Sequence, residues 1–364
     1  MIPLCVPEIR GNEWKYMKEC LDTGWVSYAG SFVSLFEERF AACIDADHAV
    51  ATMNGTAALH LALAALGIGP GDEVIVPTLT FIAPVNAVTY TGATPVFVDA
   101  EERTWNMDVR LVEEKITGRT RAILPVHLFG HPVDLDPLLE IAGKYGLYVV
   151  EDASESLGAR YKGKNVGVLG DIGCFSFNAN KLITTGGGGM LVTGNAALAE
   201  KARFLSSQAK ALGAAYFHPD IGYNYRMTNV QAAMGVAQLE QIEEYLAAKR
   251  QNALLYNAQL ADVEGVVGPL EEDWATHSYW LYSVLVDGCP LSRDELVLKL
   301  ADAGMESRPF FLPIHSLPPY RNRCHGDFPV AGRLAGRGLN LPSSVGLQEE
   351  EILRVCRKLK EFSG

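Results

Sequence analysis

The sequence predicts an α/β fold: a large domain built on a mostly parallel sheet, and a smaller α+β domain toward the C-terminus. Short runs rich in Val and Ile alternate with amphipathic segments through the first two thirds of the chain, as strands linked by helices do. These runs lack strict polar and apolar alternation, which is typical of strands covered by helices on both faces. The length of 364 residues also exceeds what one compact core usually holds.

Seven segments are predicted as strands of the large sheet: 48–53, 73–76, 94–98, 122–126, 148–151, 172–177 and 190–192. Helical patterns lie between several of them, at 56–66, 81–91, 135–145 and 196–205. One long helical pattern over 229–260 is expected to lead out of the large domain. The small domain is predicted to contain a strand at 280–286 and helices at 293–303 and 349–362.

The predicted domains are therefore 1–245, a large domain whose N-terminal segment can pack on the small one, and 246–364. The formal net charge of −12 argues against a nucleic-acid surface, which needs a basic stripe. No apolar run approaches the roughly 20 residues of a membrane span. The first residues also lack a basic segment followed by an apolar run. We therefore expect a cytoplasmic protein with neither nucleic-acid nor membrane partners.

A carboxylate and a lysine follow two of the predicted strands. One apolar strand ends at Asp152, and the strand at 172–177 delivers Ser176 and then Lys181 into a glycine-rich turn. Ligand sites in open α/β sheets lie beyond the carboxyl ends of strands. A partly desolvated lysine has a lowered pKa, which favours the free amine needed for a Schiff base. The positions alone are equally compatible with a surface loop lysine, and the helix N-cap is the more common role of such an aspartate.

The segment from Asn54 to Ala58 opens a helix directly after the first strand. Free amide groups and the helix dipole favour an anion at such a point, typically a phosphate, and Gly55 lets the backbone come close. The hydroxyl of Ser176 is a further candidate for this phosphate. An ordinary turn and cap is the alternative interpretation. Phe81 is a candidate for stacking on a planar ring, although an aromatic residue at a helix start is more often part of a core.

Together these motifs resemble the sugar aminotransferases of the DegT/DnrJ/EryC1/StrS family, which are fold-type I enzymes dependent on pyridoxal 5′-phosphate (PLP). The resemblance covers essentially the whole chain. It is carried by GWVS at 24–27, NGTAAL at 54–59, PTLTF at 77–81, HLFG at 127–130, EDASES at 151–156, FSFNANK at 175–181, TTGGGGM at 184–190, GYNYRMTN at 222–229 and SRPFF at 307–311. It implies transamination, with PLP as the cofactor and glutamate as the amino donor. No metal is expected, because Gly130 and Pro132 disfavour a helix that would pair His127 with His131, and Cys324-His325 is too isolated for a metal site.

The resemblance also implies a role for each matching residue. Lys181 would hold PLP as a Schiff base, and Asp152 would pair with the protonated ring nitrogen. Glu155 stands where the family carries Gln, His or Glu near the cofactor. The remaining cofactor contacts would come from the amides at the start of the helix and the serine, which bind the phosphate, and from an aromatic residue that covers the ring: Gly55, Thr56, Ala57, Ser176 and Phe81.

Asn224, within GYNYRMTN, would reach the phosphate site of the neighbouring subunit, which implies a homodimer with shared active sites. Trp25 and Ser27 are candidates for substrate binding. The nucleotide pyrophosphate needs basic or N–H donors, for which the candidates are Arg226, Arg308 and Lys249. A surface ion pair is the alternative role of Arg226.

Within the family, the motifs look most like the bacillosamine and legionaminic acid branch. This branch implies amination of the 4-keto carbon of a UDP-linked 2-acetamido-2,6-dideoxy-4-keto-hexose, used in cell-surface glycans or nonulosonic acids. Gly187 stands where many relatives carry Glu, and we interpret it as a marker of the branch. The alternatives are a nucleotide sugar of the GDP-perosamine or TDP-amino-sugar type, and a non-catalytic regulatory or binding protein. The intact Lys181 and Asp152 argue against the last.

Overall fold

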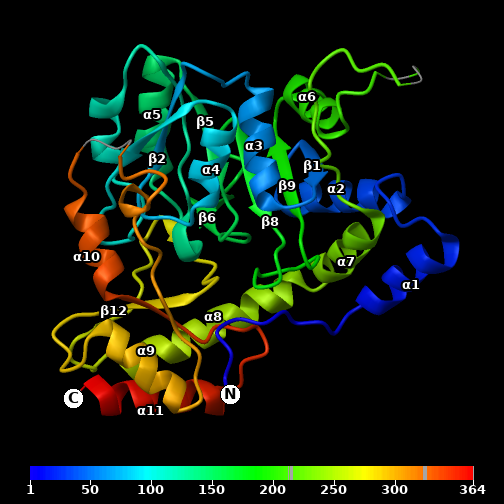
Figure 1. Ribbon diagram of the computed structural model, residues 1–364. Coiled ribbons are helices and arrows are strands. Elements are labelled where there is room, and N and C mark those ends of the chain that lie inside the picture. Colours follow the sequence, from blue (N-terminus) through cyan, green and yellow to red (C-terminus); the bar gives the residue numbers. More distant parts are fainter. Residues whose placement is uncertain (212, 214–215, 323–325, 364) are drawn as a thin grey trace.

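A seven-stranded sheet lies at the centre of the computed structural model, which describes residues 1–211, 213, 216–322 and 326–363. Its strand order is β1-β9-β8-β5-β4-β2-β3 (Figure 1). Only β9 runs against its neighbours, so the mostly parallel sheet predicted from the sequence is confirmed. The strands are β1 His48–Thr52, β2 Glu73–Pro77, β3 Thr94–Val98, β4 Thr120–Ile123, β5 Tyr148–Asp152, β8 Ile172–Ser176 and β9 Gly189–Thr193.

Helices cover both faces of this sheet because the strands are apolar on both sides. In β2, Val74 and Val76 belong to one hydrophobic cluster, while Ile75 between them belongs to the other. The first cluster includes residues of α3 Gly55–Ala65, α4 Ala83–Tyr90 and α6 Ala196–Ser206. The second includes residues of α2 Ser31–Cys43, α5 Leu135–Tyr145 and α7 Asn229–Leu239. The result is a three-layer α/β/α arrangement.

A second, four-stranded antiparallel sheet lies in the C-terminal part of the chain, in the order β10-β12-β14-β13. Its strands are β10 Val266–Val267, β12 Tyr282–Val286, β13 Arg308–Pro309 and β14 Gly338–Leu341. Three helices share a hydrophobic cluster with it: α8 Ile242–Leu260, α9 Arg293–Asp302 and α11 Glu349–Ser363. The N-terminal segment joins this unit, since Ile2 is part of the cluster and its N–H bonds to the Gly304 carbonyl at 2.8 Å. The boundary after residue 245 stays a prediction, and α8 runs across it (Figure 1).

The remaining elements are short. A three-stranded sheet joins β6 Arg160–Tyr161, β7 Lys164–Asn165 and β11 Ala275–Thr276. Helix α10 spans Pro329–Arg337, and single 3₁₀ turns lie at Val109–Leu111, Glu113–Lys115, Leu128–Gly130 and Ile314–Ser316. Within the part of the chain that the structure describes, no helix is both long and apolar enough to cross a membrane.

The single helix predicted over 229–260 is wrong, because the structure divides it into α7 and α8 at Glu240 and Gln241. The N–H of Gln241 bonds three residues back, to the Gln238 carbonyl, so the regular ladder is interrupted there. The Glu240 carboxylate accepts hydrogen bonds from Asn12, Tyr16 and Arg39. Polar contacts with the N-terminal helices therefore tie down the chain at the break.

Two N-terminal helices were not predicted: α1 Glu13–Thr23 and α2. Phe32, Phe36 and Phe40 are all buried on α2, and their spacing of four residues is a helical signal present in the sequence. Both helices pack against α7. They thus complete the cover on the second face of the sheet.

Candidate active site

A cavity of about 400 Å³ lies at the carboxyl ends of the strands, between the large sheet and the four-stranded one. The parallel strands bring Pro77, Asp152 and Ser176 to the same edge. The start of α3 lies at this edge too. Thr52, at the end of the strand before α3, and Ser176 both pair with Gly189 on β9. The cavity is lined by most of the predicted site residues: Gly55, Thr56, Phe81, Asp152, Glu155, Ser176, Lys181 and Arg308.

Lys181 points into this cavity. Only 13% of its side chain is exposed, so the alternative of a surface lysine is wrong. Its Nζ lies 3.7 Å from Oε1 of Glu155 and 3.5 Å from the centroid of the Trp280 ring. Burial lowers the pKa of Lys181, and the nearby carboxylates of Glu155 and Asp152 partly offset this effect. The side chain thus resembles the partly desolvated amine that the sequence predicts.

Asp152 ends β5 and is 4% exposed. The next regular element is β6, so the N-cap alternative is wrong. One of its oxygens accepts the Ser154 N–H at 3.0 Å. Burial raises the pKa of Asp152, because a desolvated carboxylate has lost the water that stabilised its charge. A cation placed against it, such as a protonated ring nitrogen, would restore that stabilisation.

Glu155 lies between the Phe129 backbone and Lys181. Its Oε2 accepts the Phe129 N–H at 2.9 Å, while Oε1 faces the lysine. Burial raises the pKa of Glu155 to about 7. Near neutral pH this carboxyl is therefore populated both with and without its proton, so it can either donate or accept a hydrogen bond.

The start of α3 forms a cradle of backbone groups next to Ser176. A Cβ added to Gly55 would come within 2.8 Å of the Ser176 Cβ, so only glycine fits there. The Thr56 amide lies in the first turn, where the helix provides no carbonyl partner. The Ala57 amide donates instead to Oδ1 of Asn54 at 2.7 Å. The prediction that the Ala57 amide binds the phosphate is therefore corrected, because this amide already donates to the Asn54 side chain that caps the helix.

Phe81 lies in the wall of the cavity and is 53% exposed, so the core alternative is wrong. Its ring packs at a tilt against Phe311, with centroids 5.6 Å apart. Because so much of the ring remains uncovered, it can still stack on a planar ligand.

Besides Ala57, and Lys249 discussed below, the cavity lining of the single chain lacks four predicted residues: Trp25, Ser27, Asn224 and Arg226. Trp25, Ser27 and Asn224 are exposed. Among the described residues, the buried Nε of Arg226 has no hydrogen-bond partner, which gives no support to the ion-pair alternative. Its guanidinium lies 5.8 Å from the Tyr28 ring centroid. Their roles in the site stay predictions, and that of Asn224 depends on a neighbouring subunit.

The two other candidates for pyrophosphate binding differ. Lys249 is 2% exposed, and its ammonium group donates to the carbonyls of Trp280 and Ser343. It cannot reach a ligand, so that prediction is wrong. Arg308 does line the cavity, where it pairs with Glu306 at 2.7 Å and keeps 61% of its side chain exposed.

Trp280 was missed as a site residue. The sequence places it at the start of a strand, and nothing local distinguishes it from a core aromatic residue. In the structure it precedes β12, is 5% exposed and lines the cavity beside Lys181. Only the fold could reveal this neighbourhood.

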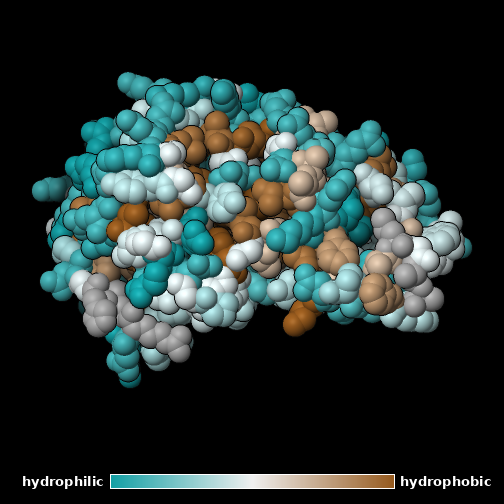
Figure 2. Space-filling model, turned by 90° about the horizontal axis from the view of Figure 1, so that it is seen from above, coloured by the Kyte–Doolittle hydropathy of each residue, from teal (hydrophilic) through white to brown (hydrophobic). Residues whose placement is uncertain are grey.

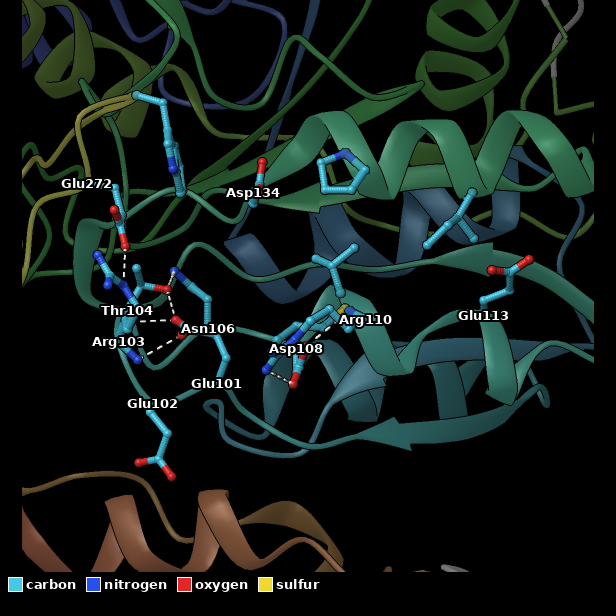
Figure 3. A pocket seen from close by; sticks show the side chains of 15 residues that line it. Glu101, Glu102, Arg103, Thr104, Asn106, Asp108, Arg110, Glu113, Asp134 and Glu272 are labelled. Atoms are coloured by element: carbon cyan, nitrogen blue, oxygen red, sulfur yellow. Dashed lines mark hydrogen bonds and ion pairs between the residues drawn. The ribbon is translucent and has the colours of Figure 1, made fainter.

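A larger cavity, of about 600 Å³, lies elsewhere (Figure 3). Both of its arginines pair with carboxylates that also line it: Arg103 with Glu272 at 2.7 Å, and Arg110 with Asp108 at 2.8 Å. No lysine lines it. Volume alone therefore does not identify the site, whereas the buried amine and carboxylates of the smaller cavity do.

The model of the DegT/DnrJ/EryC1/StrS aminotransferase family matches residues 7–360. The chain belongs to this family. It is 48% identical to the GDP-perosamine synthase of Caulobacter vibrioides, over 99% of this chain and 98% of that protein. It is 46% identical to the GDP-perosamine synthase of Escherichia coli O157:H7, over 99% and 98%. The PLP form of Spr1654 from Streptococcus pneumoniae superposes with a TM-score of 0.94 at 29% identity, covering 100% of this chain and 98% of that one.

The protein is thus a PLP-dependent sugar aminotransferase with the fold of its family, as the resemblance implied. The residues of the cavity fit this cofactor. Lys181 offers an amine, and Asp152 is a buried carboxylate whose pKa burial raises despite the nearby lysine. The start of α3 offers the Thr56 amide beside Ser176, and Phe81 offers an open ring face. The alternative of a non-catalytic protein has no support from this arrangement.

Proposed function

We propose that this aminotransferase moves an amino group from glutamate to the 4-keto carbon of a GDP-linked 6-deoxy sugar, with GDP-perosamine or a close relative as the product. The high identity to two GDP-perosamine synthases, over nearly the whole of both chains, carries this proposal. The UDP-linked substrate of the bacillosamine branch has less support, because that prediction depended on a few short motifs. The GDP-sugar alternative therefore replaces it.

Each part of the cavity would have its own task. When bound, PLP supplies an electron sink for the substrate carbon that loses a proton. Lys181 would hold the cofactor covalently and, once released as a free amine, would move a proton between two carbons. Asp152 would keep the ring nitrogen protonated, since an adjacent negative charge stabilises the cation. Thr56 and Ser176 would bind the phosphate.

A coupled assay tests the substrate. The purified protein would be given PLP, glutamate and one of three 4-keto-6-deoxy sugars, linked to GDP, UDP or TDP. We expect mass spectrometry to show the carbonyl replaced by an amine, with 2-oxoglutarate formed in equal amount. The kcat/KM for the GDP sugar should exceed the others by at least about tenfold, because a site that hydrogen-bonds one base leaves polar groups unpaired with another. A preference for the UDP sugar would return the assignment to the bacillosamine branch.

We also propose that the protein works as a homodimer in which Asn224 completes the phosphate site of the partner. Several large apolar side chains near the N-terminus and before the GYNYRM motif are exposed in the single chain: Trp25 at 59%, Tyr28 at 53%, Phe217 at 60% and Ile221 at 82%. Figure 2, which views the molecule of Figure 1 from above, shows hydrophobic side chains gathered in patches among polar ones on that face. Burying such residues against a second copy would be favourable.

Mixing two inactive variants tests the shared site. Lys181→Ala lacks the amine, and Asn224→Ala should bind PLP weakly. If Asn224 acts across the interface, a mixed dimer has one site with both intact residues, so the mixture should recover up to about a quarter of wild-type activity after subunit exchange (half the dimers are mixed, with one working site each). The matched control mixes Lys181→Ala with Asp152→Asn, which lie in the same site and should not complement. Complementation absent in both mixtures, or a monomer in sedimentation, would refute this arrangement.

A further inference from the structure

Trp280 forms one wall of the space that holds the Lys181 amine. The Nζ of Lys181 lies 3.5 Å from the centroid of the indole ring, which places an ammonium group directly against the aromatic face. A second partner is the Glu155 carboxyl, with Oε1 3.7 Å from the same Nζ. Trp280 is 5% exposed and Glu155 is 6% exposed, so water is largely excluded from the contact. The amine thus contacts one carboxyl group and one aromatic face.

The indole also fixes the turn that carries the lysine. Its Nε1–H donates to the Asn180 carbonyl at 2.7 Å, immediately before Lys181. The Trp280 carbonyl in turn accepts the buried ammonium group of Lys249 at 2.8 Å. Both ends of the residue are therefore held, its ring by the turn at 178–181 and its backbone by α8.

The same backbone turn positions both partners of the amine. The Phe129 N–H binds Glu155, and the Gly130 carbonyl accepts the Ser278 N–H at 3.0 Å, two residues before Trp280. A Cβ on Gly130 would lie 3.1 Å from the Trp280 N, so glycine allows this close approach. Phe129 and Tyr279 have φ angles of 54° and 50°, which non-glycine residues rarely adopt. Such strain persists only where the surrounding structure enforces it.

We propose that Trp280 is a positioning residue that receives the Lys181 amine whenever this amine is not bonded to the cofactor. The proposal rests on the proposed role of Lys181 as the attachment point. Between its release by the donor and its return, the amine must stay near the reacting carbons without the hydration that normally stabilises an ammonium group. The face of an indole attracts a cation but does not accept a proton, so it can hold the ammonium group without deprotonating it.

The charged groups around the amine fix the sign of the expected effect. Burial lowers the pKa of Lys181, whereas Glu155, Asp152 and the Cys5 thiol of the N-terminal segment raise it. The indole face also favours the ammonium form. Removing this face while keeping an apolar side chain should therefore lower the pKa of Lys181 further.

Competitive acetylation of the cofactor-free protein tests this inference, because acetic anhydride reacts only with the free amine and needs no PLP. Mass spectrometry of the Lys181 peptide from pH 5 to 11 would give its titration midpoint, with exposed Lys144 as the internal reference. In Trp280→Met we expect the midpoint to move to lower pH by roughly 0.5 to 1.5 pH units. Trp280→Phe keeps a weaker aromatic face and should move it by less. Trp274→Met, a tryptophan outside the cavity, should leave it in place.

A second readout uses the loaded enzyme. The rate constant of the glutamate half-reaction should fall about tenfold in Trp280→Met, while the Kd for PLP changes little, because the covalent link does not depend on the indole. If Lys181 forms the link to PLP but its midpoint stays in place or rises in both folded variants, the role of Trp280 is wrong and the proposed function stands. If the wild type forms no such link, the proposed function itself fails.

Discussion

Replacing Lys181 with alanine is expected to abolish both half-reactions, with a fall in turnover of at least about 10³-fold. The structure gives two reasons. The amine is the nucleophile expected to bind the cofactor, and it points into the cavity beside Asp152 and Glu155. Single-turnover absorbance with glutamate, and separately with the keto sugar, would measure each direction. The variant should also lack the absorbance band, near the visible edge, that borohydride removes in the wild type.

The fold should survive this change. Alanine leaves the Glu155 carboxyl buried, and the burial that raises its pKa lets it stay protonated at little cost. Lys144→Ala is a matched control, since this lysine is exposed and pairs only with groups on the surface. A Lys181→Ala enzyme that keeps more than a few per cent of wild-type turnover would contradict the assignment of Lys181 as the residue that binds PLP and transfers the proton.

Replacing Asp152 with asparagine is expected to lower turnover on the order of 10²-fold or more, which corresponds to about 2.7 kcal/mol of barrier. The amide keeps the shape of the side chain and loses the charge that would hold the ring nitrogen protonated. PLP should still bind, because Lys181 and the cradle at the start of α3 are unchanged. Steady-state kinetics together with the absorbance of bound cofactor would separate the loss of chemistry from a loss of binding.

Asp136→Asn is the control for this prediction, since Asp136 is more than half exposed and pairs with Lys162 on the surface. Near-normal turnover in Asp152→Asn would contradict the role of the carboxylate. A variant that no longer binds PLP would instead show that Asp152 holds the cofactor in place and does more than tune its charge.

Local sequence patterns were enough to predict the strands of the large sheet, the family and the cofactor. Short, mostly apolar runs predicted all seven strands, because a strand covered on both faces need not alternate polar and apolar residues. The order of the strands along the chain also predicted that Asp152 and Lys181 follow strands that end at one edge of a parallel sheet. The motifs around these residues identified the family and the cofactor. They did not decide the sugar, because short motifs report on the shared chemistry more than on the substrate.

The sequence by itself therefore determined the fold class and the cofactor, and it singled out Lys181 and Asp152, whose roles stay predictions. Tertiary structure alone decided that Lys249 is buried, that Asn54 caps the Ala57 amide and that Trp280 faces the Lys181 amine. Periodicity reports which side of an element faces a core. It carries no information about which distant element supplies the contact, which depends on strand order, register and the turns that bring residues 180 and 280 together.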